Sequence, residues 1–233
     1  MKLFFDADNI ALSWLSAAIA SDKHDSQPVL DRTVCIEWFD QGARIIATDG
    51  VLLIHAWAPT TNANAWYAPG DDEPPERRIV VFDPDGRGTG LLKYARKLCV
   101  AADKADEAHP DLSIEVRTAP PRPSGHVAMP GLEAECVVLE VPGAEKVLLD
   151  VIDGEYPSWQ GVARQSVEPT DDVMFAAERL KQVALLGRIQ GRPVRWRFSG
   201  QRLAVLEVED TDLETGGVLM ALRDPDAVRA EAS

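Results

Sequence analysis

The sequence predicts an α+β protein built from repeated β-α-β-β-β units, in which one amphipathic helix covers one face of each antiparallel sheet. Three observations predict this fold. Short apolar runs end at turn residues such as Asp49-Gly50, as the strands of antiparallel hairpins do. Each group of runs includes one segment whose apolar residues recur at helical spacing. This order of elements occurs three times along the 233 residues, without obvious sequence similarity between the repeats.

The first unit illustrates the assignment. Asp8-Asn9 precede apolar residues at helical spacing and predict the N-terminal cap of a helix. Asp49-Gly50 lie between two apolar runs and predict a tight hairpin with these two residues at its centre, both at positive φ. The expected elements are a strand at residues 2–5, a helix at 8–20, and strands at 34–39, 44–48 and 51–57.

Two further units follow in the same order. The second is expected to have strands at residues 78–82, 112–117, 136–141 and 146–152, with a helix at 91–102 after the first strand. The third is expected to have an extended segment at 173–175, a helix at 180–187, and strands at 194–198, 203–208 and 218–222, before a loose tail at 224–233. We predict two domains, 1–118 and 119–233, with the boundary anywhere up to about residue 165.

The composition is that of a globular protein. Hydrophobic residues make up 45% and charged residues 27%, which excludes a disordered or collagen-like chain. No apolar run approaches the ~18 residues of a membrane-spanning helix, and the apolar stretch near Met1 is too short for a secretory leader. Cys35, Cys99 and Cys136 lie far apart without CxxC spacing, so we expect reduced, buried thiols in a cytoplasmic protein.

The charge is unevenly distributed along the chain. A net charge of −14 spread evenly would predict that the protein avoids nucleic acid. Residues 87–104, however, carry +4 and residues 174–192 carry +3, which leaves −21 for the rest of the chain. Both positive segments are expected helices, and the i, i+3, i+4 spacing of Lys93, Arg96 and Lys97 puts these three side chains on one face.

Two interpretations of these basic helices remain open. They are the ordinary solvated faces of surface helices, or they contact phosphates and bind duplex DNA without reading its sequence. The candidate DNA-binding residues are Arg87, Lys93, Arg96, Lys97, Lys104, Arg179, Lys181, Arg188 and Arg192.

No motif points to a catalytic or cofactor site. Gly86-Arg87-Gly88-Thr89-Gly90 follows a strand and opens a helix, where phosphate-binding loops lie, but its spacing fits neither nucleotide-binding pattern. The acidic turns at Asp6 and Asp83 lack the distant Glu of a calcium loop. We therefore expect no enzyme, no cofactor and no metal, and we keep an enzyme that uses the glycine loop or a carboxylate pair as an alternative.

Three stretches resemble the bacterial sliding clamp, the β subunit of DNA polymerase III. Residues 44–50 (RIIATDG) are similar to the clamp's ATDG hairpin, and residues 149–159 (LDVIDGEYPSW) resemble the segment between its second and third domains. Residues 175–180, 194–198 and 218–223 are similar to its C-terminal end. These motif matches cover about a quarter of the chain, and the order of the units matches over most of it.

The resemblance implies the DNA-clamp fold, in which sheets lie outside and helices line a ring around duplex DNA. It implies a processivity factor that tethers the replicative polymerase through ring topology and weak, sequence-independent phosphate contacts. A positive bore and a negative rim would account for the uneven charge. The implied partners are duplex DNA, the polymerase and the clamp loader, with no membrane. The implied location is the cytoplasm, or the host cytoplasm for a phage protein.

The resemblance also implies a homo-oligomeric ring of twelve units, closed by head-to-tail contacts. The chain has three clear units, and residues 119–170 are a candidate for a degenerate fourth. Four units per chain would give a homotrimer, as in phage-type clamps of similar length, and three would give a tetramer; we favour the trimer. The first helix, at residues 8–20, departs from the family because it has no Lys or Arg.

Finally, the resemblance implies a hydrophobic groove that binds partner peptides. Two positions depart from the family pattern, since Val51-Leu52-Leu53 replace His-Arg-Leu and Ala221 replaces a proline. An alternative function is a clamp-fold module that binds peptides without encircling DNA. The candidate groove residues are Thr48, Gly50, Leu53, Pro157, Trp159, Met220, Leu222 and Arg223.

Overall fold

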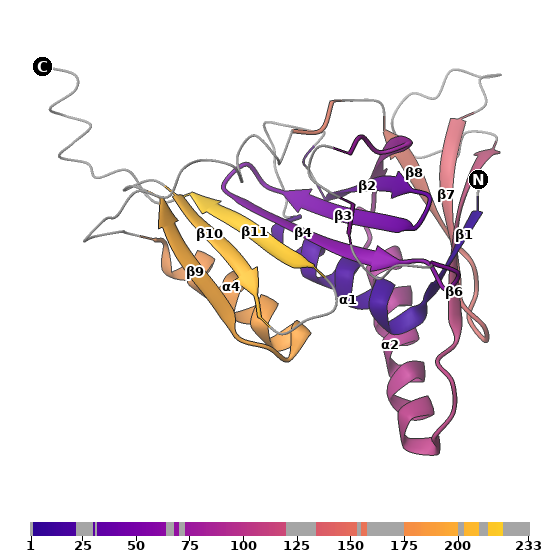
Figure 1. Cartoon of the computed structure of the whole chain (residues 1–233). Coiled ribbons are helices and arrows are strands. Elements are labelled where there is room, and N and C mark those ends of the chain that lie inside the picture. The colour runs from indigo at the N-terminus through magenta and orange to yellow at the C-terminus, as the bar shows by residue number, and fades with distance from the viewer. Residues whose placement is uncertain are drawn as a thin grey trace, which may run out of the picture.

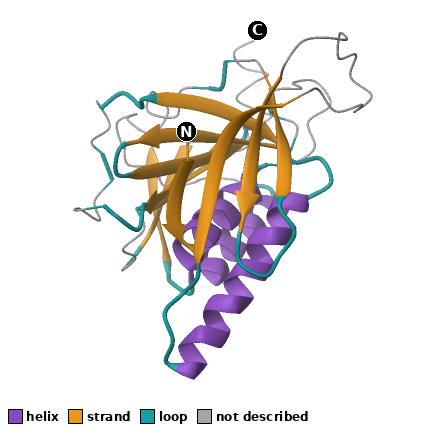
Figure 2. Ribbon diagram, turned by 90° about the vertical axis from the view of Figure 1, so that its right-hand side faces the viewer, coloured by secondary structure: helices purple, strands orange, loops and turns teal. Residues whose placement is uncertain are grey.

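The computed structural model describes residues 2–21, 30, 32–63, 68–69, 73–119, 134–152, 155–157, 175–199, 203–209 and 214–220. These residues form one 11-stranded sheet with the helices gathered on one side of it (Figures 1 and 2). The helices are α1 (Ala7–Ala17), extended by a 3-10 turn (Ala18–Ala20), α2 (Arg87–Ala105) and α4 (Ala177–Gln190). The strands are β1 (Lys2–Asp6), β2 (Thr33–Phe39), β3 (Gly42–Thr48), β4 (Leu52–Pro59), β5 (Arg77–Phe82), β6 (Asp111–Ala119), β7 (Ala134–Glu140), β8 (Val147–Ile152), β9 (Val194–Ser199), β10 (Leu203–Val208) and β11 (Thr215–Met220).

The first two units interlock. The strand order is β1-β6-β7-β8-β5-β2-β3-β4-β11-β10-β9, and every neighbouring pair is antiparallel. The first strand of each unit crosses to the other unit, because β1 pairs with β6 and β5 pairs with β2. An antiparallel bridge between Phe5 and Thr60 brings the free edge of β1 back to the end of β4. Strands β6 and β7 pair with each other across the predicted boundary at residues 118 and 119.

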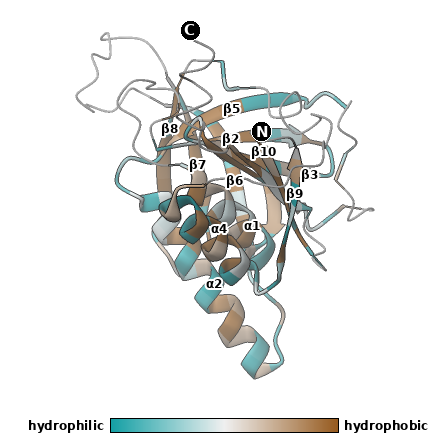
Figure 3. Ribbon diagram, turned by 90° about the vertical axis from the view of Figure 1, so that its left-hand side faces the viewer, coloured by the Kyte–Doolittle hydropathy of each residue, from teal (hydrophilic) through white to brown (hydrophobic). Residues whose placement is uncertain are grey.

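The third unit continues the same sheet. Strand β11 pairs with β4, with Val218 opposite Leu53, and β10 and β9 follow outward (Figure 1). Helix α4 covers these strands on the side where α1 and α2 lie (Figure 3). Of the predicted extended segment, Phe175 is described and its ring packs against Trp196 and Phe198. Residues 173–174 and the predicted tail at 224–233 lie outside the described residues.

The apolar side chains form two clusters, one on each face of the sheet. The larger cluster lies between the sheet and the helices and includes the fully buried Trp14 and Trp38. Alternate residues of β2 divide between the faces: Ile36 joins the helical side and Cys35 joins the smaller outer cluster. The outer cluster consists of Leu30, Cys35, Ile46, Leu53, Val80 and Tyr156. All three cysteines are buried thiols that form no disulfide among the described residues, as predicted.

Two local predictions were wrong by a few positions. The cap of α1 is Asp6 rather than Asp8-Asn9, because the Asp6 carboxylate accepts hydrogen bonds from the Asp8 and Asn9 amides at 3.0 Å. The β3–β4 hairpin forms, but Gly50 and Val51 are its central residues, since the Asp49 amide donates to the Leu52 carbonyl at 3.2 Å. Gly50 has φ of 86°, whereas Asp49 does not adopt positive φ. The Asp49 carboxylate accepts from the Val51 and Leu52 amides, which fixes this residue at the corner.

Candidate functional site

The helical side of the sheet is the candidate nucleic-acid interface. Helix α1 packs against both α2 and α4 and lies between them (Figure 1). Because α1 contains no Lys or Arg, the positive charge on this side comes from the two outer helices.

Seven of the nine predicted DNA-binding side chains are exposed on this side. They are Arg87, Lys93, Lys97, Lys104, Lys181, Arg188 and Arg192. Among these seven, and within the described part of the chain, Lys181 alone pairs with an acid, Glu178, at 3.0 Å. The other six form no ion pair with the described residues.

Arg96 is half-buried and joins all three helices. Its Nη2 donates to the Ile189 carbonyl near the end of α4 at 2.9 Å, and its Nε lies 3.6 Å from Asp8 Oδ1 on α1. Burial raises the pKa of Asp8, and the charge of Arg96 opposes that shift. Arg96 therefore holds α4 and α2 together over the N-terminal end of α1.

Arg179 is also engaged within the fold. Its guanidinium forms an ion pair with the buried carboxylate of Asp49 and donates to Gln182 Oε1 at 2.8 Å. This contact connects the first turn of α4 to the β3–β4 hairpin. Arg179 thus lies at the junction of the first and third units, apart from the exposed basic side chains.

The glycine-rich start of α2 is occupied by a carboxylate of the same chain. Asp83 accepts hydrogen bonds from the Gly88 amide at 3.1 Å, from the Thr89 amide at 3.0 Å and from the Thr89 hydroxyl at 3.1 Å. A phosphate bound at this helix terminus would have to displace Asp83. The geometry therefore disfavours the nucleotide-binding alternative.

The candidate groove residues come together on the outer face, around the β3–β4 hairpin. The Thr48 amide donates to the Tyr156 hydroxyl at 2.9 Å, which anchors the segment around residue 156 to the end of β3. Burial raises the pKa of Tyr156, so this hydroxyl stays neutral. The Gly50 amide donates to Thr48 Oγ1 at 3.0 Å, and Pro157 is exposed beside Tyr156.

Strand β11 supplies the other wall of this surface. The Met220 amide donates to the Val51 carbonyl at 2.9 Å, and the two side chains are 49% and 38% exposed. Behind them, Leu53 and Val218 face each other across the β4–β11 pair and are buried. The result is an apolar surface with exposed side chains at its rim.

Three of the predicted groove residues lie outside the described residues, and two residues beside the groove were not predicted. Trp159, Leu222 and Arg223 lie outside the described residues. The groove prediction missed Leu30, which joins the outer cluster from a position with no sequence pattern to indicate it. It also missed Tyr156 as a contact residue, although the resembling segment contains it.

Two absences hold for the described residues only. They contain no group of three or more His, Cys, Asp and Glu side chains arranged to hold a metal ion. Likewise, none of the described helices combines the length and apolar character needed to cross a bilayer.

No family model matches the chain, and no curated protein matches it in sequence. Solved structures of bacterial clamps do match its three-dimensional structure. For the DNA polymerase III β subunit of Thermotoga maritima the TM-score is 0.58 at 12% identity, over 98% of this chain and 66% of that chain. For the β subunit of Pseudomonas aeruginosa it is 0.57 at 13% identity, over 96% of this chain and 67% of that chain. For the sliding clamp of Caulobacter crescentus the TM-score is 0.55 at 12% identity, over 98% of this chain and 68% of that chain.

The chain has the sliding-clamp fold. The predicted α+β architecture, with antiparallel strands on one side and helices on the other, is confirmed. The chain spans about two thirds of the length of the clamps it matches. At 11–13% identity the likeness concerns the fold, so the activity rests on the residues of this chain.

Proposed function

We propose that this chain is a DNA polymerase processivity factor, a non-enzymatic sliding clamp that encircles duplex DNA and captures polymerase and loader peptides in the cytoplasm. The observation that carries the proposal is the exposure of seven basic side chains on the helical side of a clamp-fold sheet, within a protein of net charge −14. Lys and Arg on helices at this surface suit phosphates, which are the same in every sequence.

A ring requires several copies of the chain. The described residues hold three units, with β7 and β8 belonging to the second, which favours four copies over the trimer expected from the sequence. We propose the domain boundary after Ile152, because the strands before it interlock into one eight-stranded body. Residues 153–154 and 158–174, which follow, lie outside the described residues.

The outer apolar surface around Met220 and Val51 is the proposed docking site for partner peptides. It lies where the first and third units meet, and the Asp49–Arg179 ion pair fixes their relation beneath it. Leu53 and Tyr156 form the floor, and an apolar peptide side chain would bury Met220 on binding.

Topological retention tests the DNA part of the proposal. The protein is mixed with linear duplex DNA, the ends are blocked with biotin and streptavidin, and the complex is passed through a sizing column. Retention is expected on blocked DNA and loss from open-ended DNA. Equal retention on both would contradict encirclement.

Charge reversal tests the assigned face. Lys93→Glu, Lys97→Glu and Lys104→Glu together should abolish retention. They should also lower the salt dependence of binding, by about 0.9 in log–log slope for each phosphate that is no longer neutralised. The matched control reverses Lys2, Arg117 and Lys146, which are also exposed but lie on or beside strands. If both triple variants lose retention alike, general charge rather than the helical face is responsible.

A fluorescent peptide from the tail of a bacterial replicative polymerase tests the groove. Met220→Asp should weaken its binding at least roughly tenfold, because a charge would enter the apolar contact. Val100→Asp, at a similarly exposed position on α2, is the control and should bind normally. Equal binding by both variants would move the peptide site elsewhere.

One observation favours the second candidate, a clamp-fold module that binds peptides without encircling DNA. The central helix α1 has no basic residue and presents Asp8 between the two basic helices. Peptide binding together with equal loss from blocked and open DNA would establish this alternative.

A further inference from the structure

Strand β9 forms one edge of the sheet. It pairs with β10 along its whole length and with no other strand of the described residues. Its sequence, VRWRFS, has no Pro, and its two charged residues, Arg195 and Arg197, form ion pairs with Glu209 and Glu207 of the same chain. Within the described part of the chain, the outer backbone edge of β9 therefore remains open to a partner strand.

The first domain contains two strands equivalent to β9, and both are covered. The strand that follows the helix is β2 in the first unit, β6 in the second and β9 in the third. The edge of β2 is covered by β5, and the edge of β6 by β1, each from the opposite unit. Helices α1 and α2 pack against each other over this junction. The fold itself thus indicates what covers the edge of β9: a second unit of the same kind, arriving with its helix.

The side chains around this edge fit such a contact. On the helical side, Trp196 is half-buried and Phe198 is 39% exposed, while Leu180 at the start of α4 is 46% exposed. Ala184 and Gly187 continue the stripe from Leu180 at i+4 and i+7, which puts all three on one flank of α4. Gly187 lets the start of β9 approach closely, since a Cβ there would lie 3.1 Å from Val194 Cγ2. This stripe, with Trp196 and Phe198, forms the β9 patch.

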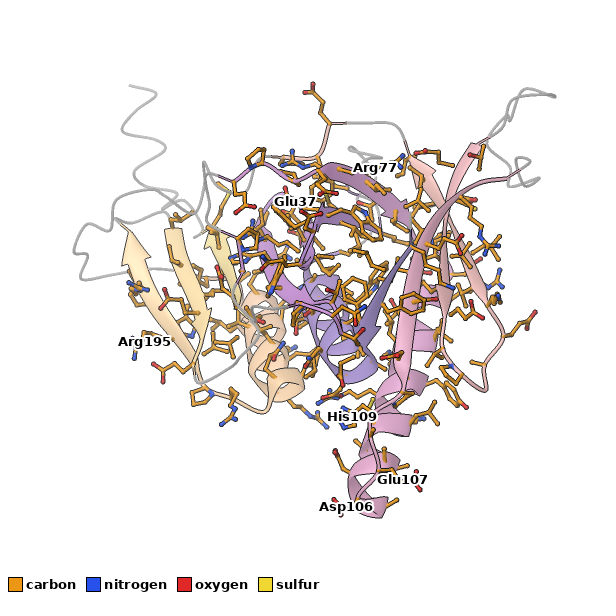
Figure 4. All side chains as sticks on the ribbon, turned by 45° about the vertical axis from the view of Figure 1, so that its right-hand side comes forward. Glu37, Arg77, Asp106, Glu107, His109 and Arg195 are labelled. Carbon is orange, nitrogen blue, oxygen red and sulfur yellow. The ribbon has the colours of Figure 1, made fainter. Side chains whose placement is uncertain are left out.

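The charges beside the β9 patch are neutralised within the chain. On the outer face of β9, Arg195 pairs with Glu209 and Arg197 pairs with Glu207 (Arg195 is labelled in Figure 4). Strand β9 itself therefore brings no unpaired charge to such a contact. An apolar patch that meets its own copy across a two-fold axis is self-complementary.

We propose that the third unit of a second copy of this chain covers the β9 patch across a two-fold axis, so that two third units complete one clamp domain. Helix α4 then packs against the partner's α4 along Leu180 and Ala184, as α1 packs against α2. This contact is isologous, unlike the head-to-tail joint that the sequence led us to expect. The inference rests on the fold and stands whether or not the protein binds DNA.

Light scattering after size exclusion of the 233-residue chain tests the contact. The wild type should show species that contain even numbers of chains, and Leu180→Glu or Ala184→Glu should weaken self-association at least roughly tenfold. The matched control is Leu185→Glu, at a 44% exposed position on another flank of the same helix, which should keep the wild-type mass. All three sites are exposed, so circular dichroism melts should match the wild type.

Cross-linking identifies the symmetry. Ala184→Cys should link two copies through a short bis-maleimide, because only a two-fold contact brings the same residue of both chains together. Cys35, Cys99 and Cys136 are buried and do not compete. A monomeric wild type at every concentration, an unchanged mass for Leu180→Glu, or a trimer whose Ala184→Cys variant forms no cross-link would each overturn the proposal. Loss of DNA retention by a variant that still dimerises would leave it intact.

Discussion

The hydroxyl of Tyr156 accepts a hydrogen bond from the backbone amide of Thr48 at 2.9 Å, across 108 positions of sequence. This contact joins the segment after β8 to the hairpin that borders the candidate groove. It forms beside the outer apolar cluster, where both groups are shielded from water.

Tyr156→Phe should therefore destabilise the protein. The substitution leaves the buried Thr48 amide without its acceptor, at a cost of about 1–3 kcal/mol in the free energy of unfolding. Urea denaturation measures the change. Tyr94→Phe is the control, because its exposed hydroxyl makes only a 3.5 Å contact with the Gly143 carbonyl, and it should shift stability by less than about 0.5 kcal/mol. Equal effects of the two variants would refute the anchoring role.

Arg179→Gln should lower the free energy of unfolding and should have a smaller effect on the free energy of DNA binding. Asp49 is buried, so removal of its partner leaves a carboxylate without an opposite charge, at a cost of about 2 kcal/mol for a partly exposed pair. The double variant with Asp49→Asn should cost less than the sum of the single changes, which urea denaturation of all four proteins would measure. Lys181→Gln, at an exposed position two residues along α4, is the control. Additive single effects would mean that the two residues do not interact.

Asp83→Ala should weaken the start of α2. The carboxylate satisfies two backbone amides at the first turn, and its loss should cost about 1–2 kcal/mol. Thermal melting followed by circular dichroism measures this. Asp85→Ala, an exposed change in the same turn, should have little effect. An unaltered melting temperature for Asp83→Ala would show that the helix start is held by other contacts.

His109 should make stability depend on pH. Its hydrogen bond with Asp103 raises the pKa of His109, and Asp6, which contacts the other ring nitrogen, adds to the effect. Because the folded-state pKa is above the unfolded value of about 6.5, this stabilisation is complete below that value and is lost as the pH rises through the folded pKa. Proton NMR titration of the imidazole checks the shift, and Asp103→Asn should lower it.

The same titration has an internal control. Burial lowers the pKa of His55 to about 3, so its resonances should not move between pH 5 and 8. A His109 resonance that titrates at its ordinary value, or unfolding curves of His109→Asn and the wild type with the same pH dependence, would contradict the interpretation.

Much of the fold could be predicted because its patterns are local. Helical spacing located α2, and a short apolar run located β8, since each pattern depends on neighbours a few positions apart. Strand β2 is buried on both faces, so its apolar run alone could not reveal which residues face the helices and which form the groove floor. The position of the β3–β4 turn also escaped prediction. The side-chain bonds of Asp49, rather than the Asp-Gly pair alone, decide which residues occupy its centre.

The sequence by itself determined the order of elements, the apolar side of each helix and the concentration of positive charge in two of them. Only the tertiary structure decided that β1 pairs with β6, that β11 continues the sheet from β4, and that β9 is left at an edge. It also separated Arg96 and Arg179, which are engaged inside the fold, from the basic side chains that remain exposed. The physical reason is the separation in sequence between the residues that interact. Periodicity and charge are read from residues close in the chain, whereas strand partners and ion pairs depend on contacts between residues far apart in sequence, whose closure the whole fold must stabilise.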